Sequence, residues 1–132
     1  MLICKQWGEV MVMNKKCVLV VDDMATNRRV AKNFLNVKDI EIFEAKNGQE
    51  AVDIFKEKQD VIDLILMDVA MPVMDGYEAT KKIREFSSVP IIALTAHAYQ
   101  EDVDQALESG MNFHLAKPIE AETFFEVIER FI

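Results

Sequence analysis

DLILMD, residues 63–68, is a short run of apolar residues that ends in an aspartate. Continuous apolar runs of this length are typical of parallel strands that are buried on both faces of a sheet. Four further runs have the same character, although the last is weaker: CVLVV (17–21), IEIFEA (40–45), PIIALT (90–95) and MNFHLA (111–116). We therefore expect a parallel sheet of five strands.

Segments with helical spacing follow the five runs. Apolar residues recur in them at every third or fourth position, which indicates helices with one buried face. The expected stripes are Val30, Phe34 and Leu35, then Ala51, Val52 and Phe55, then Ala79 and Ile83, then Val103, Ala106 and Leu107, and finally Phe124, Val127, Ile128 and Phe131. Asn47-Gly48 is expected to open the second helix, Asp75-Gly76 to lie in the loop before the third, and Gly110 to end the fourth. The alternation predicts an α/β fold with five helices, arranged on both faces of the sheet.

Composition narrows the class of protein. The chain has 132 residues, with 15 Lys and Arg against 23 Asp and Glu and a net charge of -8. This length predicts one domain, and the acidic balance disfavours direct binding of nucleic acid. Cys4 and Cys17 share no metal-ligand spacing with other Cys or His residues, so we expect reduced thiols.

The N-terminal stretch is fairly apolar, but charged and polar residues interrupt it before a signal-peptide core or a membrane span could form. We expect a cytoplasmic protein whose domain makes no membrane contact. Residues 1–14 precede the first strand and are interpreted as an extension or a linker remnant, and residues 15–132 as the domain.

Polar side chains stand where four of the expected strands end. Asp22 and Asp23 end the first strand, Asp68 the third and Thr95 the fourth, and Lys117 follows the fifth. Ligands of an open parallel sheet bind at this edge. Each residue alone has an ordinary explanation as a helix cap, turn residue or solvated lysine, but their coincidence at four strand ends favours a functional site.

The chemistry of this set indicates phosphoryl transfer. Carboxylates held close together repel one another unless a cation compensates, and hard oxygen ligands suit Mg²⁺. Lys117 offers a point charge for a phosphoryl oxygen and Thr95 a hydrogen-bond donor. Because the sequence has no GxxxxGK loop to cradle a nucleotide, we expect the acceptor to be a carboxylate of the protein itself.

Four stretches resemble the response-regulator receiver domain of two-component signalling: VLVVDD (18–23), LILMDVAMPVMDGYEA (64–79), PIIALTAHA (90–98) and GMNFHLAKPI (110–119). The resemblance covers about residues 15–132. The sequences of the last two stretches are most similar to those of receivers of hybrid sensor histidine kinases. The resemblance implies a flavodoxin-like three-layer sandwich with strand order 2-1-3-4-5, and a phosphoacceptor signalling domain rather than an enzyme that acts on an external metabolite.

The resemblance also implies roles for the residues at the strand ends. Asp68 would be the phosphoacceptor. The implied magnesium ligands are Asp23, Asp68 and the backbone carbonyl of Ala70, with Asp22 acting through water. Thr95 and Lys117 would bind the phosphoryl oxygens, and the bond between Lys117 and Pro118 would be cis.

Three positions depart from the commonest pattern of that family. His114 stands where receivers usually carry a Tyr or Phe that swings inward on activation, so the switch would pair Thr95 with an imidazole. Ala70, two residues after the acceptor, has no polar side chain, and His97, two residues after Thr95, has a large one. By resemblance, residues 70 and 97 tune the lifetime of the phosphorylated state.

The expected function is a switch that takes a phosphoryl group from a phosphohistidine. Its partner would be a histidine kinase or a histidine phosphotransfer protein, with the chain acting either as a single-domain regulator or as the receiver part of a hybrid kinase. In this family the fourth helix, fifth strand and fifth helix form the signalling surface, through which a homodimer is possible.

Two alternatives remain open. A magnesium-dependent phosphohydrolase of the haloacid dehalogenase type also uses an aspartyl phosphate. However, Asp22-Asp23-Met24 lacks the DxDxT spacing of those enzymes, and 132 residues leave no room for a cap domain. The other alternative is a receiver-like binding module that never becomes phosphorylated. The complete set of residues at the strand ends argues against it.

Overall fold

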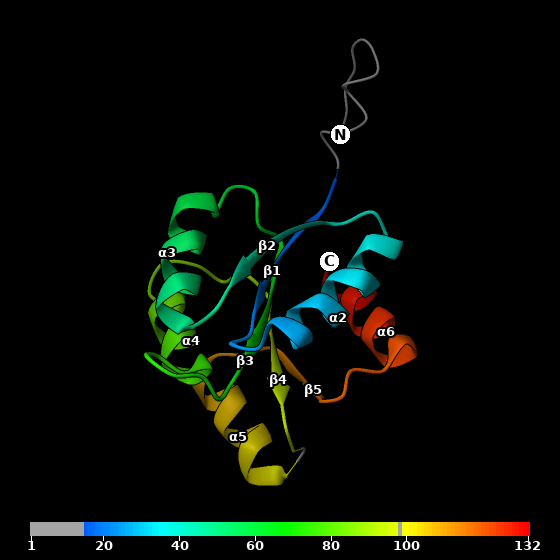
Figure 1. The fold of residues 1–132 in the computed structure, drawn as a ribbon. Coiled ribbons are helices and arrows are strands. Elements are labelled where there is room, and N and C mark those ends of the chain that lie inside the picture. The colour runs from blue at the N-terminus through cyan, green and yellow to red at the C-terminus, as the bar shows by residue number, and fades with distance from the viewer. Residues whose placement is uncertain (1–14, 98) are drawn as a thin grey trace.

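The computed structural model describes residues 15–97 and 99–132. Within these residues five strands alternate with five helices (Figure 1). The strands are β1 (Cys17–Val21), β2 (Glu41–Ala45), β3 (Leu64–Asp68), β4 (Ile91–Thr95) and β5 (Phe113–Ala116). The helices are α2 (Ala25–Val37), α3 (Gly48–Lys58), α4 (Gly76–Arg84), α5 (Gln100–Ser109) and α6 (Ala121–Phe131). The extension expected at residues 1–14 lies outside the described residues.

All five strands are parallel and follow the order β2-β1-β3-β4-β5. Helices α2 and α6 cover one face of the sheet, and α3, α4 and α5 cover the other (Figure 1). This arrangement confirms the predicted flavodoxin-like three-layer sandwich.

The interior strands carry the core. Every residue of β1, β3 and β4 is buried, as their continuous apolar runs predict. The two edge strands differ, since each has a neighbour on one side only. On β2, Glu41 and Glu44 are exposed, and on β5 only Leu115 is fully buried.

The helix termini follow their capping residues. The Asn47 side chain accepts a hydrogen bond of 2.9 Å from the backbone N–H of Glu50, so α3 begins where predicted. Gly110 ends α5 with a φ of 107°, a left-handed conformation that suits glycine. Asp75, by contrast, caps α4, so Gly76 is the first residue of the helix rather than part of the loop before it.

Two residues of the expected helical stripes were placed wrongly. Val30 is 38% exposed and Leu107 is 54% exposed. In α2 the buried positions are Ala31 and Leu35. The small side chain of Ala31 faces the sheet, which turns Val30 towards the solvent. Where two apolar residues are adjacent in a helix, the periodic pattern does not decide which of them faces the sheet.

Gly76 stands against the end of β3. A Cβ atom at this position would lie 2.2 Å from the backbone oxygen of Asp68 and 2.9 Å from Cα of Val69. The backbone N–H of Gly76 also donates to the Val69 carbonyl at 3.0 Å. Only glycine allows α4 to begin this close to the strand.

Candidate functional site

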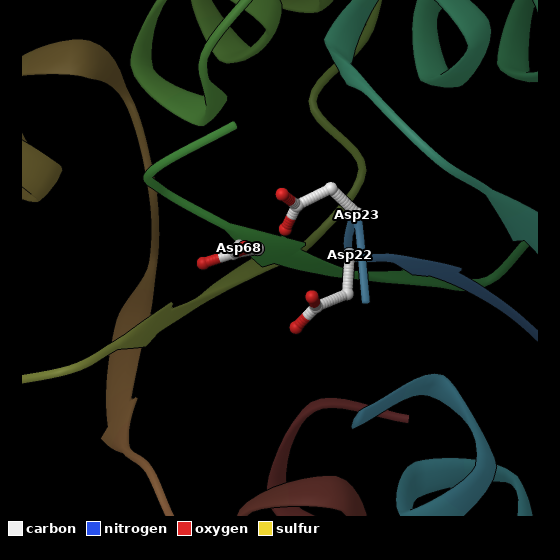
Figure 2. Close-up of side chains that lie close together, drawn as sticks. All are labelled: Asp22, Asp23 and Asp68. Carbon is white, nitrogen blue, oxygen red and sulfur yellow. The ribbon is translucent and has the colours of Figure 1, made fainter. Parts of the chain in front are cut away.

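Three carboxylates meet at the carboxyl edge of the sheet. Asp22 and Asp23 directly follow β1, and Asp68 is the last residue of β3 (Figure 2). One carboxylate oxygen of each residue lies within 4.8 Å of those of the other two. Figure 2 shows the side chains of Asp22 and Asp23 leaving the chain in opposite directions, with that of Asp68 beside them. The structure thus brings together the acidic residues that the sequence predicted to converge.

Lys117 neutralises part of this charge. Its Nζ lies 3.0 Å from Asp22 Oδ2 and 3.1 Å from Asp68 Oδ1. Its backbone N–H donates a hydrogen bond of 2.7 Å to the carbonyl of Thr95, and the bond to Pro118 is cis, as expected. Burial alone would lower the pKa of Lys117, but its contacts with the two carboxylates raise that pKa above its ordinary value. The lysine therefore remains charged.

Asp68 lies in an environment that disfavours its charge. Only 3% of the residue is exposed. Burial, together with the negative charge of Asp22, raises the pKa of Asp68 to about 6, although Lys117 opposes the rise. Both close contacts of the Asp68 carboxylate go to Oδ1, which faces Lys117 and accepts from the backbone N–H of Ala70 at 3.4 Å. Among the described residues, none donates a hydrogen bond to Oδ2.

Thr95 presents a hydroxyl group to this edge. The residue is 2% exposed, and its Oγ1 has no hydrogen-bond partner within residues 15–97 and 99–132. A buried polar atom without a partner costs stability unless a ligand or water satisfies it. The Thr95 hydroxyl is therefore free to form a hydrogen bond with an oxygen atom of a bound ligand.

A cleft of about 610 Å³ opens beside these groups. Its walls come from the loop after β3, the loop after β4 and the facing sides of α4 and α5. The lining residues are Val69, Ala70, Met71, Pro72, Asp75, Tyr77, Thr95, Ala96, His97, Asp102 and Gln105. Ala70 and His97 are both exposed in it, so the two positions expected to influence lifetime do face one space.

Two histidines were singled out from the sequence. His97 stacks on Tyr99, with ring centroids 5.0 Å apart and an interplanar angle of 10°. His114 lies on β5, opposite Ala93 on β4, and is half-buried. Its ring is 5.6 Å from that of Phe113. These contacts locate both side chains and leave the proposed switching role of His114 a prediction.

Sequence reasoning missed Arg28. Its Nη1 donates a hydrogen bond of 2.8 Å to the backbone carbonyl of Asp22, and its Nε donates one of 2.9 Å to Glu44. The available signal was an arginine at the start of the helix that follows the acidic pair. Its partner on β2 lies 16 residues further along the chain, and no spacing rule predicts such a contact.

The donor set fits a hard divalent cation. Within the part of the chain that the structure describes, Lys117 is the one lysine that pairs with carboxylates of this cluster, and Asp23 is exposed at the rim. Mg²⁺ binds through one or two carboxylates and keeps several waters. The carboxylate oxygens and the adjoining cleft meet both requirements.

The family can be read from the sequence comparison. Residues 18–129 match the response regulator receiver domain. The chain belongs to that family. The receiver is 40% identical over 119 residues to hybrid signal transduction histidine kinase I of Dictyostelium discoideum, a match covering 84% of this chain and 7% of the kinase. The chain therefore spans a small part of the length of that relative.

Two solved structures share the receiver fold. One is a co-crystal structure of a Saccharomyces cerevisiae histidine phosphotransfer protein with the receiver domain of its downstream response regulator. It has a TM-score of 0.83 and 38% identity, and covers 89% of this chain and 88% of that chain. The other is the receiver domain of a Pseudomonas aeruginosa sensor histidine kinase, with a magnesium ion coordinated in the active site cleft. Its TM-score is 0.81 at 36% identity, covering 89% of this chain and 97% of that one.

The receiver is a phosphoacceptor module of two-component signalling rather than an enzyme in its own right. This membership favours the first of the functions considered from the sequence over a phosphohydrolase. Among the helices of the described residues, none is long and apolar enough to cross a membrane.

Proposed function

We propose that Asp68 accepts a phosphoryl group from a phosphohistidine of a histidine kinase or histidine phosphotransfer protein. The observation that carries this assignment is the position of Asp68 at the end of β3, with Lys117 Nζ 3.1 Å from its Oδ1 and the unpartnered Thr95 hydroxyl at the end of the next strand. Among the three carboxylates of the site, only Asp68 lies on the strand that pairs directly with the strand of Thr95, because Asp22 and Asp23 follow β1.

The chain's own residues direct the transfer. Because Lys117 and the Ala70 amide hold Oδ1, Oδ2 is the oxygen that attacks phosphorus. The new O–P bond forms as the N–P bond of the phosphohistidine breaks, and the leaving imidazole nitrogen keeps the electron pair of that bond. Lys117 and Thr95 then bind two of the phosphoryl oxygens, where positive charge and a hydrogen bond stabilise the transferring group.

Mg²⁺ would be held by Asp23, Asp68 and the backbone carbonyl of Ala70, with Asp22 acting through water. When bound, the cation neutralises the charge that develops on the phosphoryl oxygens. Support comes from the convergence of the three carboxylates and from the related receiver that has magnesium in its active site cleft.

A partner protein would approach the carboxyl edge of the sheet. The co-crystal structure of a yeast phosphotransfer protein with a related receiver supports a phosphohistidine partner of that class. We also propose that the chain works either as a single-domain regulator or as the receiver part of a hybrid kinase. A homodimer through α5, β5 and α6 and a cytoplasmic location also stay predictions.

The switch and the signal lifetime are assigned to the residues named from the sequence. Thr95 turns towards the bound phosphoryl group, and His114 moves into the space that it leaves and so alters the face formed by α5, β5 and α6. Ala70 and His97 flank the water that hydrolyses the aspartyl phosphate. Their shared position on the cleft supports this assignment.

Incubation with acetyl phosphate and Mg²⁺, followed by intact-mass measurement, tests the proposal. The unmodified protein should gain one phosphoryl group, and Asp68→Asn should gain none. Asp75→Asn is the matched control, because this exposed carboxylate lines the same cleft outside the acidic cluster. Persistent stoichiometric labelling of Asp68→Asn would show a different acceptor, and no labelling of the unmodified protein would favour the unphosphorylated binding module.

A further inference from the structure

Arg28, at the start of α2, connects three elements at the acidic end of β1. One of its nitrogens binds the Asp22 carbonyl at 2.8 Å, and another binds Glu44 on β2 at 2.9 Å. Only 13% of the Arg28 side chain is exposed. A guanidinium held by a carbonyl and a carboxylate at once is fixed in orientation, because its donors form a rigid planar fork.

The carbonyl that Arg28 binds belongs to the peptide group between Asp22 and Asp23. Before this peptide, the Asp22 N–H donates to the Ala45 carbonyl at 3.1 Å, and after it the Met24 N–H donates to Asp22 Oδ1 at 2.9 Å. The Asp23 side chain is exposed and makes no hydrogen bond or ion pair within residues 15–97 and 99–132. The backbone therefore sets the direction in which the Asp23 side chain leaves the chain, and no side-chain contact among the described residues adds to it.

Glu44 holds Arg28 from the far side. Its second carboxylate oxygen accepts a hydrogen bond of 2.9 Å from Lys32. The bonds from Lys32 and Arg28 keep the pKa of Glu44 below its ordinary value, so the carboxylate stays charged. The guanidinium is thus anchored to β2 while it holds the loop after β1.

We infer that Arg28 is a positioning residue for the divalent cation, because it fixes the Asp22-Asp23 peptide and thereby aims the Asp23 carboxylate into the acidic site. This inference rests on the proposed function of that site. The direction of the change in Mg²⁺ affinity distinguishes positioning by Arg28 from the effect of its charge alone. A nearby positive charge repels Mg²⁺, so removal of the charge alone would strengthen binding, whereas loss of positioning weakens it.

Calorimetric titration of the full chain with magnesium chloride tests this inference. Arg28→Met should weaken Mg²⁺ binding about tenfold, a typical effect for residues that orient metal ligands. Arg28→Lys, which keeps the charge but lacks the planar fork, should restore part of that loss. The matched control is Lys32→Met, which removes a positive charge from the same network and leaves the bond to Asp22 intact. Its Mg²⁺ affinity should be unchanged or slightly higher.

The outcomes are distinct. Unchanged or tighter binding by Arg28→Met would overturn the inference and leave the proposed function in place. No Mg²⁺ binding by the unmodified protein would overturn both. If Arg28→Met does not fold, Glu44→Ala takes its place, because it removes the support of Arg28 from β2. It should weaken binding by about threefold, less than the roughly tenfold loss that is typical when a direct orienting partner is removed. Unchanged affinity in Glu44→Ala would then count against the inference.

Discussion

Lys117 Nζ lies 3.1 Å from Asp68 Oδ1, and this contact joins the loop after β5 to the end of β3. The same nitrogen is 3.0 Å from Asp22, so one cation serves two buried carboxylates. The protein itself therefore compensates part of the charge of the acidic site before any metal or phosphoryl group arrives.

Replacement of this lysine should lower the free energy of unfolding by an amount that depends on pH. In Lys117→Met the two buried carboxylates lose their cation, which should cost about 3 kcal/mol of unfolding free energy at about pH 8. The cost should shrink towards about pH 5, because a protonated Asp68 needs no counter-ion. Urea unfolding at the two pH values measures it, with Lys38→Met, an exposed ion-pair lysine, as the control. An equal loss at both pH values would contradict the electrostatic origin.

Asp68 itself should lower the stability of the metal-free protein at neutral pH. Its folded pKa of about 6 is above the ordinary value of 3.8, so the native state binds a proton in a range where the unfolded chain does not. Unfolding free energy therefore falls as pH rises between these two values.

Asp68→Asn should remove this slope and be more stable at about pH 7, by up to about 3 kcal/mol, in the presence of a chelator. Asp60→Asn, at an exposed position, should change little. Thermal unfolding across the pH range gives both values. An Asp68→Asn curve parallel to that of the unmodified protein would refute the assignment.

The lifetime of the phosphorylated state should depend on Ala70 and His97. Ala70 offers no group to orient the attacking water, whereas the imidazole of His97, stacked on Tyr99, lines the cleft and is expected to shield it. Ala70→Asn should therefore speed hydrolysis about tenfold, equivalent to roughly 1.4 kcal/mol of barrier. His97→Ala should also shorten the lifetime. Decay of the phosphorylated protein in Mg²⁺ is the measurement, and rates that are unchanged or slower in both variants would show that neither side chain governs the water.

Val73 adopts a strained backbone conformation in the loop between β3 and α4. Its φ is 70°, and its side chain is exposed, so no packing offsets the strain of a β-branched residue in this region. Val73→Gly should raise the unfolding free energy by about 1 kcal/mol. Val61→Gly, at another exposed position without a positive φ, should lower it. Denaturant midpoints compare the two, and a loss of stability in Val73→Gly would be the contrary result.

The face formed by α5, β5 and α6 is acidic, which bears on dimerisation. Helix α5 carries four acidic residues and no basic one. Helix α6 carries three acidic residues and one arginine. A symmetric pair would bring these charges together, so we expect a monomer at low salt and any homodimer through this face only at higher salt, where screening is stronger. Sedimentation velocity at two salt concentrations measures this, and a dimer confined to low salt would contradict it.

The sequence predicted the interior of the fold better than its edges. The run CVLVV coincides with β1, Cys17–Val21, because burial on both faces leaves a continuous apolar signature. Val30 and Leu107 were misplaced because a helix with adjacent apolar residues can present either of them to the sheet. The strand-end residues were predictable because parallel topology brings strand ends to one edge. Arg28 was not, because its contacts depend on the packing of α2 against β2.

Because Gly76 lies so close to the Asp68 carbonyl, the end of β3 is connected more stiffly to α4 than to α2. A displacement of the Asp68 backbone towards α4 meets atoms already in contact, so the first turn of that helix has to move with it. Among the described residues no hydrogen bond or ion pair joins α2 directly to Asp68; the polar connection runs through Lys117, whose ion pairs with Asp68 and Asp22 can lengthen and absorb the same displacement. A backbone displacement that starts at β3 should therefore move the first turn of α4 by a similar amount and move α2 less.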